Sequence, residues 1–207
     1  MLGPVPGLKP PSQRRRILEA MVTSCAEKTY AGTTIADVVS RATVSRTTFY
    51  KLFNDKRDCF DAAADLCVDR IAATVAAAAA GHESPAEATR RGAAAMLELL
   101  AGEPELALVL SGDAVGVDPG LVERYSDFTV PALEGLWERD GMPPPKHLSP
   151  GLACGRAQLL IFHQVTAGHP ERLPSLLPDI VYLAIAPFAG HDEALRQARA
   201  AGAEVAT

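Results

Sequence analysis

One short run of residues carries the side chains best suited to recognise another molecule. Ser45, Arg46, Thr47, Tyr50 and Lys51 place hydroxyl, basic and phenolic groups within about two turns of a predicted helix. Arginine and lysine can bind guanine edges or phosphates, threonine can contact a base, and a tyrosine hydroxyl can bind a phosphate. The chemistry that this run offers is therefore recognition of nucleic acid.

The charge distribution points the same way. Residues 1–60 contain ten Lys and Arg against five Asp and Glu, and residues 61–207 contain ten against twenty, so the two parts carry +5 and −10 of the total −5. A basic segment suits a polyanion because each neutralised phosphate releases a counterion. A chance fluctuation of surface charge would produce the same counts, so charge alone leaves both explanations open.

Two short helices must present this run. Thr34 is a predicted N-cap, and apolar residues recur after it at helical spacing. This stripe comprises Ile35, Val38, Val39 and Ala42. After a break, Ser45 caps a second helix that extends through Phe53. The residues predicted to face inward there are Val44, Phe49, Leu52 and Phe53. Two short helices joined by a tight turn, with polar side chains exposed on the second, are typical of a helix-turn-helix.

Further helices flank this pair. Residues 1–11 contain four Pro and two Gly and are predicted to form a flexible arm, after which Ser12 caps a helix that ends near Lys28. The three arginines at 14–16 lie in its first turn, where cations oppose the helix dipole. A nearby anion would explain them, and a solvated run of charge is the alternative. Asn54 or Asp55 begins a long helix that extends to about residue 80.

The helix-turn-helix resembles the DNA-binding domain of the TetR family of transcriptional regulators. The resemblance rests on the pattern Val-Ser-x-x-Thr-Phe-Tyr-x-x-Phe-x-x-Lys over residues 44–56, and upstream on Arg16-Ile-Leu-Glu-Ala and Tyr30. It covers residues 12–62. The family pattern implies that Thr34, Thr48 and Tyr50 touch backbone phosphates, that Ser45, Arg46, Thr47 and Lys51 lie along the DNA groove, and that Lys56 anchors the far side.

One residue departs from the family pattern. Thr43 stands in the turn where the family usually has Gly. A β-branched residue adopts a left-handed conformation poorly, so the turn is expected to be adjusted here.

The remaining residues also show helical patterns. Helices are predicted over 84–101, 103–110, 118–139 with a kink at Pro131, 150–167 and 178–189, with a short tail helix over 192–201. The segments 150–167 and 176–189 are apolar over more than one face, which indicates burial in a core or in an interface. In the resembled family the last two long helices pair with their copies, which implies a homodimer through these segments.

The resemblance also implies a ligand site among the middle helices. The residues whose chemistry suits its lining are Met96, Tyr125, Phe128, Trp137, Phe162 and His163. Buried Tyr and Trp need a hydrogen-bond partner, and a ligand could provide one. Residues of these types are more often plain core, so ordinary core packing is the alternative for each of them.

The sequence offers little chemistry of another kind. The five His show no i, i+4 pairing, and no nucleophile-elbow, Walker or dinucleotide motif is present. The four Cys form no metal-binding spacing and are interpreted as reduced thiols of a cytoplasmic protein. No apolar run reaches transmembrane length. We therefore expect neither an enzyme nor a membrane protein, and no metal or cofactor.

Together these features predict an all-α chain in three parts: an arm over 1–11, a helix-turn-helix domain over 12–58 and a ligand-sensing and dimerisation domain over 59–207. The predicted function is that of a repressor, which binds a palindromic double-stranded DNA operator as a homodimer and is released by a small molecule. The alternative is a helical protein that binds a ligand or partner and has lost operator specificity.

Overall fold

A computed structural model of the protein describes residues 12–82, 84–111, 131, 133–135, 137, 138, 141 and 150–205. All regular secondary structure in these residues is helical, which confirms the predicted all-α fold. The chain divides into two compact units, Met1–Leu66 and Cys67–Thr207.

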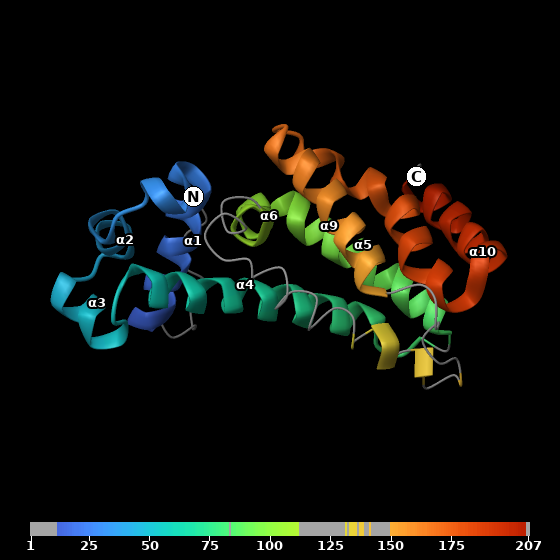
Figure 1. Ribbon diagram of the computed structural model, residues 1–207, viewed down its shortest axis with the longest axis horizontal. Helices are drawn as coiled ribbons and strands as arrows, with labels where there is room; N and C mark the ends of the chain where they lie inside the picture. The colour runs from blue at the N-terminus through green and yellow to red at the C-terminus, as the bar shows by residue number, and fades with distance from the viewer. Residues whose placement is uncertain are drawn as a thin grey trace, which may run out of the picture. The chain divides into compact units, whose positions relative to one another are not determined.

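The first unit contains α1 (Gln13–Gly32), α2 (Ile35–Ala42), α3 (Arg46–Leu52) and the first turns of α4 (Lys56–Ala79) (Figure 1). The three predicted N-caps are confirmed. Ser12 Oγ accepts a hydrogen bond from the Arg15 amide at 3.2 Å, and Ser45 Oγ accepts one from the Thr48 amide at 3.0 Å. At the start of α2, Thr34 forms a capping box with Asp37.

The core of the first unit holds α3 in place. Phe49 is fully buried and Phe53 nearly so, as predicted, and Val44 is half-buried. Leu52 was predicted to face inward, and this prediction is wrong because its exposed fraction is 39%. The chain leaves the helix at Phe53, which is extended at φ −142° and ψ 141°. Phe53 therefore takes the inner position at the end of α3, and Leu52 lies on the outer flank.

The first unit extends further along α4 than residue 58, the predicted end of the helix-turn-helix domain. Phe60 is buried and contacts the Tyr30 ring edge-on, with 4.7 Å between ring centroids. Cys59, Ala63 and Ala64 are also buried. The first turns of α4 thus belong to the N-terminal core as much as the three helices before them.

The second unit contains the later turns of α4, α5 (Pro85–Gly102), α6 (Pro104–Ser111), α9 (Pro150–Thr166), the 3₁₀ helix η1 (Pro170–Leu176) and α10 (Leu177–Val205). These helices match the predicted ones closely, except that η1 was not predicted. The helix predicted over 118–139 falls largely outside the described residues. Helix α5 packs against η1 and α10, and α9 packs against α6 and α10. The side chains of Leu97, Leu173, Val181 and Ile185 are fully buried in this core.

Helix α10 is broken at Gly190, where φ is 79°. This break matches the predicted end at 189 and the predicted tail helix. The tail buries Ala194, Ala198 and Ala201, and a Cβ added to Gly202 would lie 3.7 Å from Pro178 Cγ, so the tail folds back onto the start of α10 (Figure 1).

One segment of the described chain has the length and composition of a membrane span. Pro170–Ala203 has a mean hydropathy of 1.4. The segment is not a single straight helix, because it begins as 3₁₀ helix and is interrupted at Gly190. Its most apolar side chains, such as Val181 and Ile185, are buried in the second unit. One third of its most apolar stretch is buried in the second unit.

Candidate nucleic-acid interface

The outer face of α3, which we define as Arg46, Thr47, Tyr50 and Lys51, is exposed as predicted. Phe49 anchors the opposite side of the helix in the core and contacts the Tyr50 ring edge-on at 5.4 Å, while Tyr50 itself remains 57% exposed. Within the part of the chain that the structure describes, the four side chains make no hydrogen bond or ion pair with the protein. Their donors are thus available to an outside acceptor.

Ser45 and Thr48 shape the start of α3. Ser45 Oγ lies 2.9 Å from Thr48 Oγ1 and accepts a hydrogen bond from the Thr48 amide. A hydrogen bond between two hydroxyls uses one of their two hydrogens. One hydroxyl hydrogen is therefore left for an external acceptor such as a phosphate oxygen.

Thr34 is more fully engaged. Its hydroxyl donates to Asp37 Oδ2 at 2.7 Å and accepts from the Asp37 amide at 3.2 Å. The same carboxylate receives Lys28 Nζ at 2.7 Å. The Lys28 hydrogen bond, followed by those from Thr34, holds the pKa of Asp37 far below its usual range. A phosphate contact by the Thr34 hydroxyl would have to compete with this permanently charged carboxylate.

Lys56 lies in a different setting from the one implied by the family resemblance. Its Nζ donates hydrogen bonds to the carbonyl oxygens of Tyr30 and Thr33 at 2.9 and 3.0 Å. The same atom lies 4.1 Å from the centre of the Tyr30 ring. Cations are stabilised at helix C-termini by the unpaired carbonyls and the dipole. Lys56 thus closes the end of α1 inside the domain, a role that sequence reasoning missed.

Most other basic residues of the first unit are also engaged. Four pair with acids: Arg15 with Glu19, Lys28 with Asp37, Arg41 with Glu27, and Arg57 with Asp61. The Arg14 guanidinium lies 5.5 Å from the centre of the Phe53 ring, and Arg16 Nε is buried without a hydrogen-bond partner among the described residues. Fewer cationic side chains are therefore available to an outside anion than the number of Lys and Arg residues in this segment suggests.

The turn between α2 and α3 retains a left-handed residue. Thr43 has φ 54° and ψ 52°, and its amide donates to the Ser40 carbonyl at 3.2 Å. The Val44 amide donates to the Val39 carbonyl at 3.0 Å, which completes a Schellman motif. The expected adjustment of the turn is thus absent. Thr43 itself adopts the conformation that favours Gly, at a cost of about 1–2 kcal/mol.

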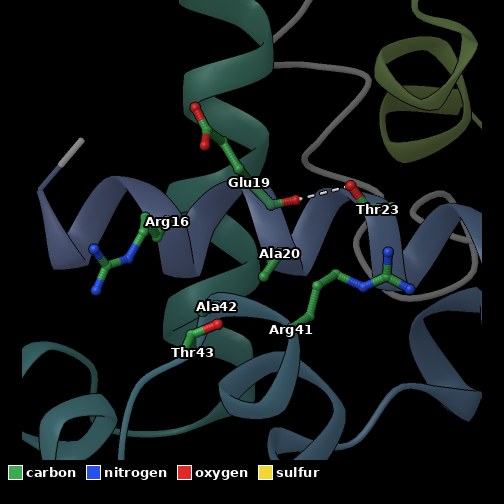
Figure 2. A pocket seen from close by; sticks show the side chains of 7 residues that line it. All are labelled: Arg16, Glu19, Ala20, Thr23, Arg41, Ala42 and Thr43. Atoms are coloured by element: carbon green, nitrogen blue, oxygen red, sulfur yellow. Dashed lines mark hydrogen bonds between the residues drawn. The ribbon is translucent and has the colours of Figure 1, made fainter. Parts of the chain in front are cut away.

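A hollow of about 580 Å³ lies between α1 and the end of α2 (Figure 2). Its floor is made of small residues such as Ala20 and Ala42. Arg16 and Arg41 point to opposite sides of it in Figure 2, so their charges do not converge on one point. Nowhere among the described residues do three or more metal-ligating side chains gather.

The proposed ligand-lining residues of the second unit fall into three groups. Met96 and Trp137 are buried and Phe162 is half-buried, whereas His163 lies on the exposed side of α9, so the structure gives it no place in a buried lining. Tyr125 and Phe128 lie outside the described residues.

Trp137 stacks on Phe188 of α10, with 5.4 Å between centroids and 7° between planes. Phe188 was identified from the sequence as part of an apolar segment, and its pairing with Trp137 comes only from the structure.

Comparison with known proteins gives the family of the first unit. Residues 17–63 match the family described as "Bacterial regulatory proteins, tetR family". This match contains α2, the turn and α3. No curated protein sequence is significantly similar to the chain.

Solved structures resemble the whole chain. The fatty acid degradation regulator FadR from Bacillus halodurans superposes with a TM-score of 0.68 at 17% identity, covering 86% of this chain and 96% of its own. A TetR family regulator from Marinobacter aquaeolei VT8 gives 0.64 at 19% identity, with coverage of 92% and 94%. FadR from Bacillus subtilis, solved in complex with stearoyl-CoA, gives 0.59 at 16% identity, with coverage of 85% and 98%. The helix-turn-helix of this chain therefore belongs to the tetR family of bacterial regulatory proteins, and the chain as a whole has the fold of TetR-type transcriptional regulators.

Proposed function

We propose that this chain is a cytoplasmic, non-enzymatic transcriptional repressor that binds a palindromic DNA operator as a homodimer and releases it when a small molecule binds the second unit. The observation that carries the proposal is the outer face of α3. It presents two cations and two hydroxyls, all without hydrogen-bond partners among the described residues, on a helix anchored by the buried Phe49. Such a helix suits the major groove of DNA.

The residues of this face take distinct roles in the proposal. Arg46, Thr47 and Lys51 lie along the groove, where they contact base edges or neighbouring phosphates. Tyr50 donates its hydroxyl to a phosphate, and the Ser45–Thr48 pair supplies one further hydroxyl hydrogen. We keep a phosphate contact for Thr34, in which the phosphate competes with Asp37 for the hydrogen of the Thr34 hydroxyl.

Lys56 receives a positioning role in place of a phosphate contact. Its Nζ carries three hydrogens, two of which are donated to the Tyr30 and Thr33 carbonyls, and the ammonium faces the Tyr30 ring. Binding a phosphate directly would require Lys56 to weaken the closure of α1. We assign to Lys56 the role of holding the end of α1 against the start of α4. Because α1 packs against α2, this contact also positions the helix-turn-helix.

Homodimerisation is supported by an apolar surface on α9. Leu159 and Leu160 are 65% and 37% exposed, and they are adjacent on a helix whose other side packs in the second unit. Exposed leucines next to each other indicate a covered surface. A second copy of this chain is the proposed occupant, with the 176–189 segment completing the contact. A dimer also places two reading helices one DNA turn (~34 Å) apart, as a palindrome requires.

Release by a ligand follows from linkage. A ligand that binds best when the two reading helices are wrongly spaced for the operator must weaken DNA binding, and DNA must weaken ligand binding equally. A regulator of the same fold has been solved with stearoyl-CoA bound, which supports a ligand site in this architecture. The proposed lining is Met96, Tyr125, Phe128, Trp137 and Phe162, without the exposed His163.

Fluorescence anisotropy tests the proposal directly. The full chain is titrated onto DNA from the intergenic region upstream of its own coding sequence, with random-sequence competitor and a salt series. Binding at least about 10³-fold tighter than to random DNA supports an operator-reading regulator. Weak binding without sequence preference, here and on a genome-wide selection of bound fragments, would favour the alternative of a ligand- or partner-binding protein.

A further inference from the structure

The second unit contains a buried hydrogen-bond donor without an acceptor. Trp137 is 2% exposed, and its indole Nε1 is buried with no partner among the described residues. Indole nitrogen can only donate, so no rearrangement of protons at this residue relieves the deficit. Buried polar groups in folded proteins are nearly always paired, and an exception requires an explanation.

The ring is held where it is. Trp137 stacks on Phe188 of α10 with 7° between the ring planes and 5.4 Å between centroids. The residues before Phe188 are core residues, since Ile185 and Pro187 are buried. Swinging the indole outward to reach solvent would break this stack and open the core. The acceptor must therefore come to Trp137.

A single buried water is a poor candidate for that acceptor. A buried water is stabilised by two to four hydrogen bonds to the protein. The stacked partner, Phe188, supplies none. A small molecule with an apolar body can fill space beside aromatic rings and bring one acceptor oxygen to the N–H.

We propose that Trp137 is the hydrogen-bonding residue of the ligand site, and that the ligand is a mainly apolar molecule with an uncharged acceptor such as an ester or ketone oxygen. This inference rests on the proposed ligand-responsive function and identifies the class of its effector. An uncharged acceptor matches a neutral donor among aromatic groups. A carboxylate there would lose its hydration without gaining an opposite charge from the indole.

The test uses three probes with the same ten-carbon chain: methyl decanoate, decanoate and decylammonium. They offer an uncharged acceptor, a charged acceptor and no acceptor. Trp137 is the only tryptophan of the chain, so its fluorescence and its ultraviolet resonance Raman bands report on this site alone. In delipidated protein the Raman spectrum should show an indole N–H without a hydrogen bond. Methyl decanoate should shift the Raman spectrum to that of a hydrogen-bonded indole N–H. It should also bind at least tenfold more tightly than the other two probes.

Two variants complete the experiment. Trp137→Phe keeps an aromatic ring and removes the N–H, so calorimetry should show methyl decanoate affinity about five- to tenfold weaker. Tyr182→Phe is the matched control, because its hydroxyl already has a partner, His191 Nδ1, at 3.0 Å. It should leave the probe affinity unchanged.

Several outcomes overturn the inference. A hydrogen-bonded indole in ligand-free protein would identify water as the acceptor. Tighter binding of decanoate than of methyl decanoate would identify a charged ligand. If methyl decanoate does not bind at all, the proposed class of ligand is wrong. The Raman measurement on the unaltered chain decides even if Trp137→Phe fails to fold. Operator binding is measured on the same sample. If the protein binds DNA but Trp137 does not respond to the probes, only this inference is wrong. If the protein does not bind DNA, the proposed function is wrong.

Discussion

The amine of Lys56 lies 2.9 Å from the carbonyl oxygen of Tyr30, a residue 26 positions earlier in the chain. The bond joins the first turn of α4 to the last turns of α1, and the Tyr30 ring in turn contacts Phe60 on α4. A lysine that the family resemblance assigns to DNA is thus part of the internal frame of the domain. The placement of α3 depends on this frame as well as on its own anchor, Phe49.

Replacing Lys56 separates a framework role from a DNA contact. Lys56→Met should lower the free energy of unfolding by about 2 kcal/mol, because it removes charge-assisted hydrogen bonds to two carbonyls. Urea unfolding measures this. Lys51→Met, on the outer face of α3, should leave stability within about 0.5 kcal/mol and reduce the salt slope of DNA binding by about 0.9 for each phosphate that Lys51 neutralises. If Lys56→Met instead reduces the slope with unchanged stability, Lys56 is a phosphate ligand.

Thr43 stores strain in the turn of the helix-turn-helix. Thr43→Gly should raise the free energy of unfolding by about 1 kcal/mol, since the relief of a left-handed β-branched residue exceeds the entropy that Gly gains in the unfolded chain. Operator affinity should be retained, because the turn keeps its conformation. Ser40→Gly, three residues earlier inside α2, is the control and should be destabilising by about 0.5 kcal/mol. A destabilising Thr43→Gly would show that Thr43 does not carry this strain.

Thr29 is a second threonine in a conformation that favours Gly, at φ 67° and ψ 162°. Its carbonyl accepts hydrogen bonds from the Thr33 amide and hydroxyl at 3.1 and 2.7 Å, which fixes the link between α1 and α2. Thr29→Gly should also raise the free energy of unfolding, by less than the full relief of strain, because it removes the hydroxyl that accepts from the Gly32 amide at 3.3 Å. The effects of Thr29→Gly and Thr43→Gly, measured by urea unfolding of the single and double variants, should add, because the residues share no described partner.

Asp37 should make the stability of the first unit depend on pH. Its pKa is lowered in the folded state by Lys28 and Thr34, whereas in the unfolded chain it lies near the ordinary value of about 3.9. The folded state is therefore stabilised in full above about pH 4, and this contribution decreases progressively as the pH falls from that value toward the lower pKa of the folded state. Urea midpoints of wild type and Asp37→Asn should differ most at pH 7, and the difference should shrink progressively as the pH is lowered below 4. Lys28→Met should weaken the same dependence, and a pH-independent difference would contradict the prediction.

The described thiols should be unreactive in the folded protein. Cys25, Cys59 and Cys67 are buried, and burial above all raises the pKa of Cys59 to about 12. At pH 8 only about one Cys59 in ten thousand is then ionised. In a Cys154→Ser background, iodoacetamide followed by mass spectrometry should find none of the three modified until the chain unfolds in urea. Rapid labelling of Cys59 in native protein would show that α4 opens locally.

Replacing an exposed leucine of α9 tests the proposed dimer. Leu159→Glu should shift the protein from dimer to monomer in sedimentation velocity, because a charge would be buried in the contact. DNA affinity should fall with it, since both half-sites must be engaged together. Glu98→Lys, at an exposed position on α5, is the control and should remain dimeric. If Leu159→Glu remains a dimer, the contact lies elsewhere.

Local signals in the sequence were sufficient for the helices and for the outer face of α3. Ser12, Thr34 and Ser45 cap helices because their hydroxyls reach amides three residues away, a relationship that spacing alone reveals. Arg46, Thr47, Tyr50 and Lys51 share a face because of the helical period and the large apolar Phe49 opposite them. The sequence therefore determined the all-α class, the position of the helix-turn-helix and its exposed polar residues.

Contacts between distant residues were decided only by the tertiary structure. The Lys56–Tyr30 bond, the Trp137–Phe188 stack and the exposure of Leu52 depend on how helices meet and where a helix ends, which local patterns do not encode. The left-handed Thr43 and Thr29 run against their own backbone preferences, so only the bonds around them hold them there. Residue types determined which helices form and which faces they show, and packing decided which cations and which buried donors of the described chain have no partner within it.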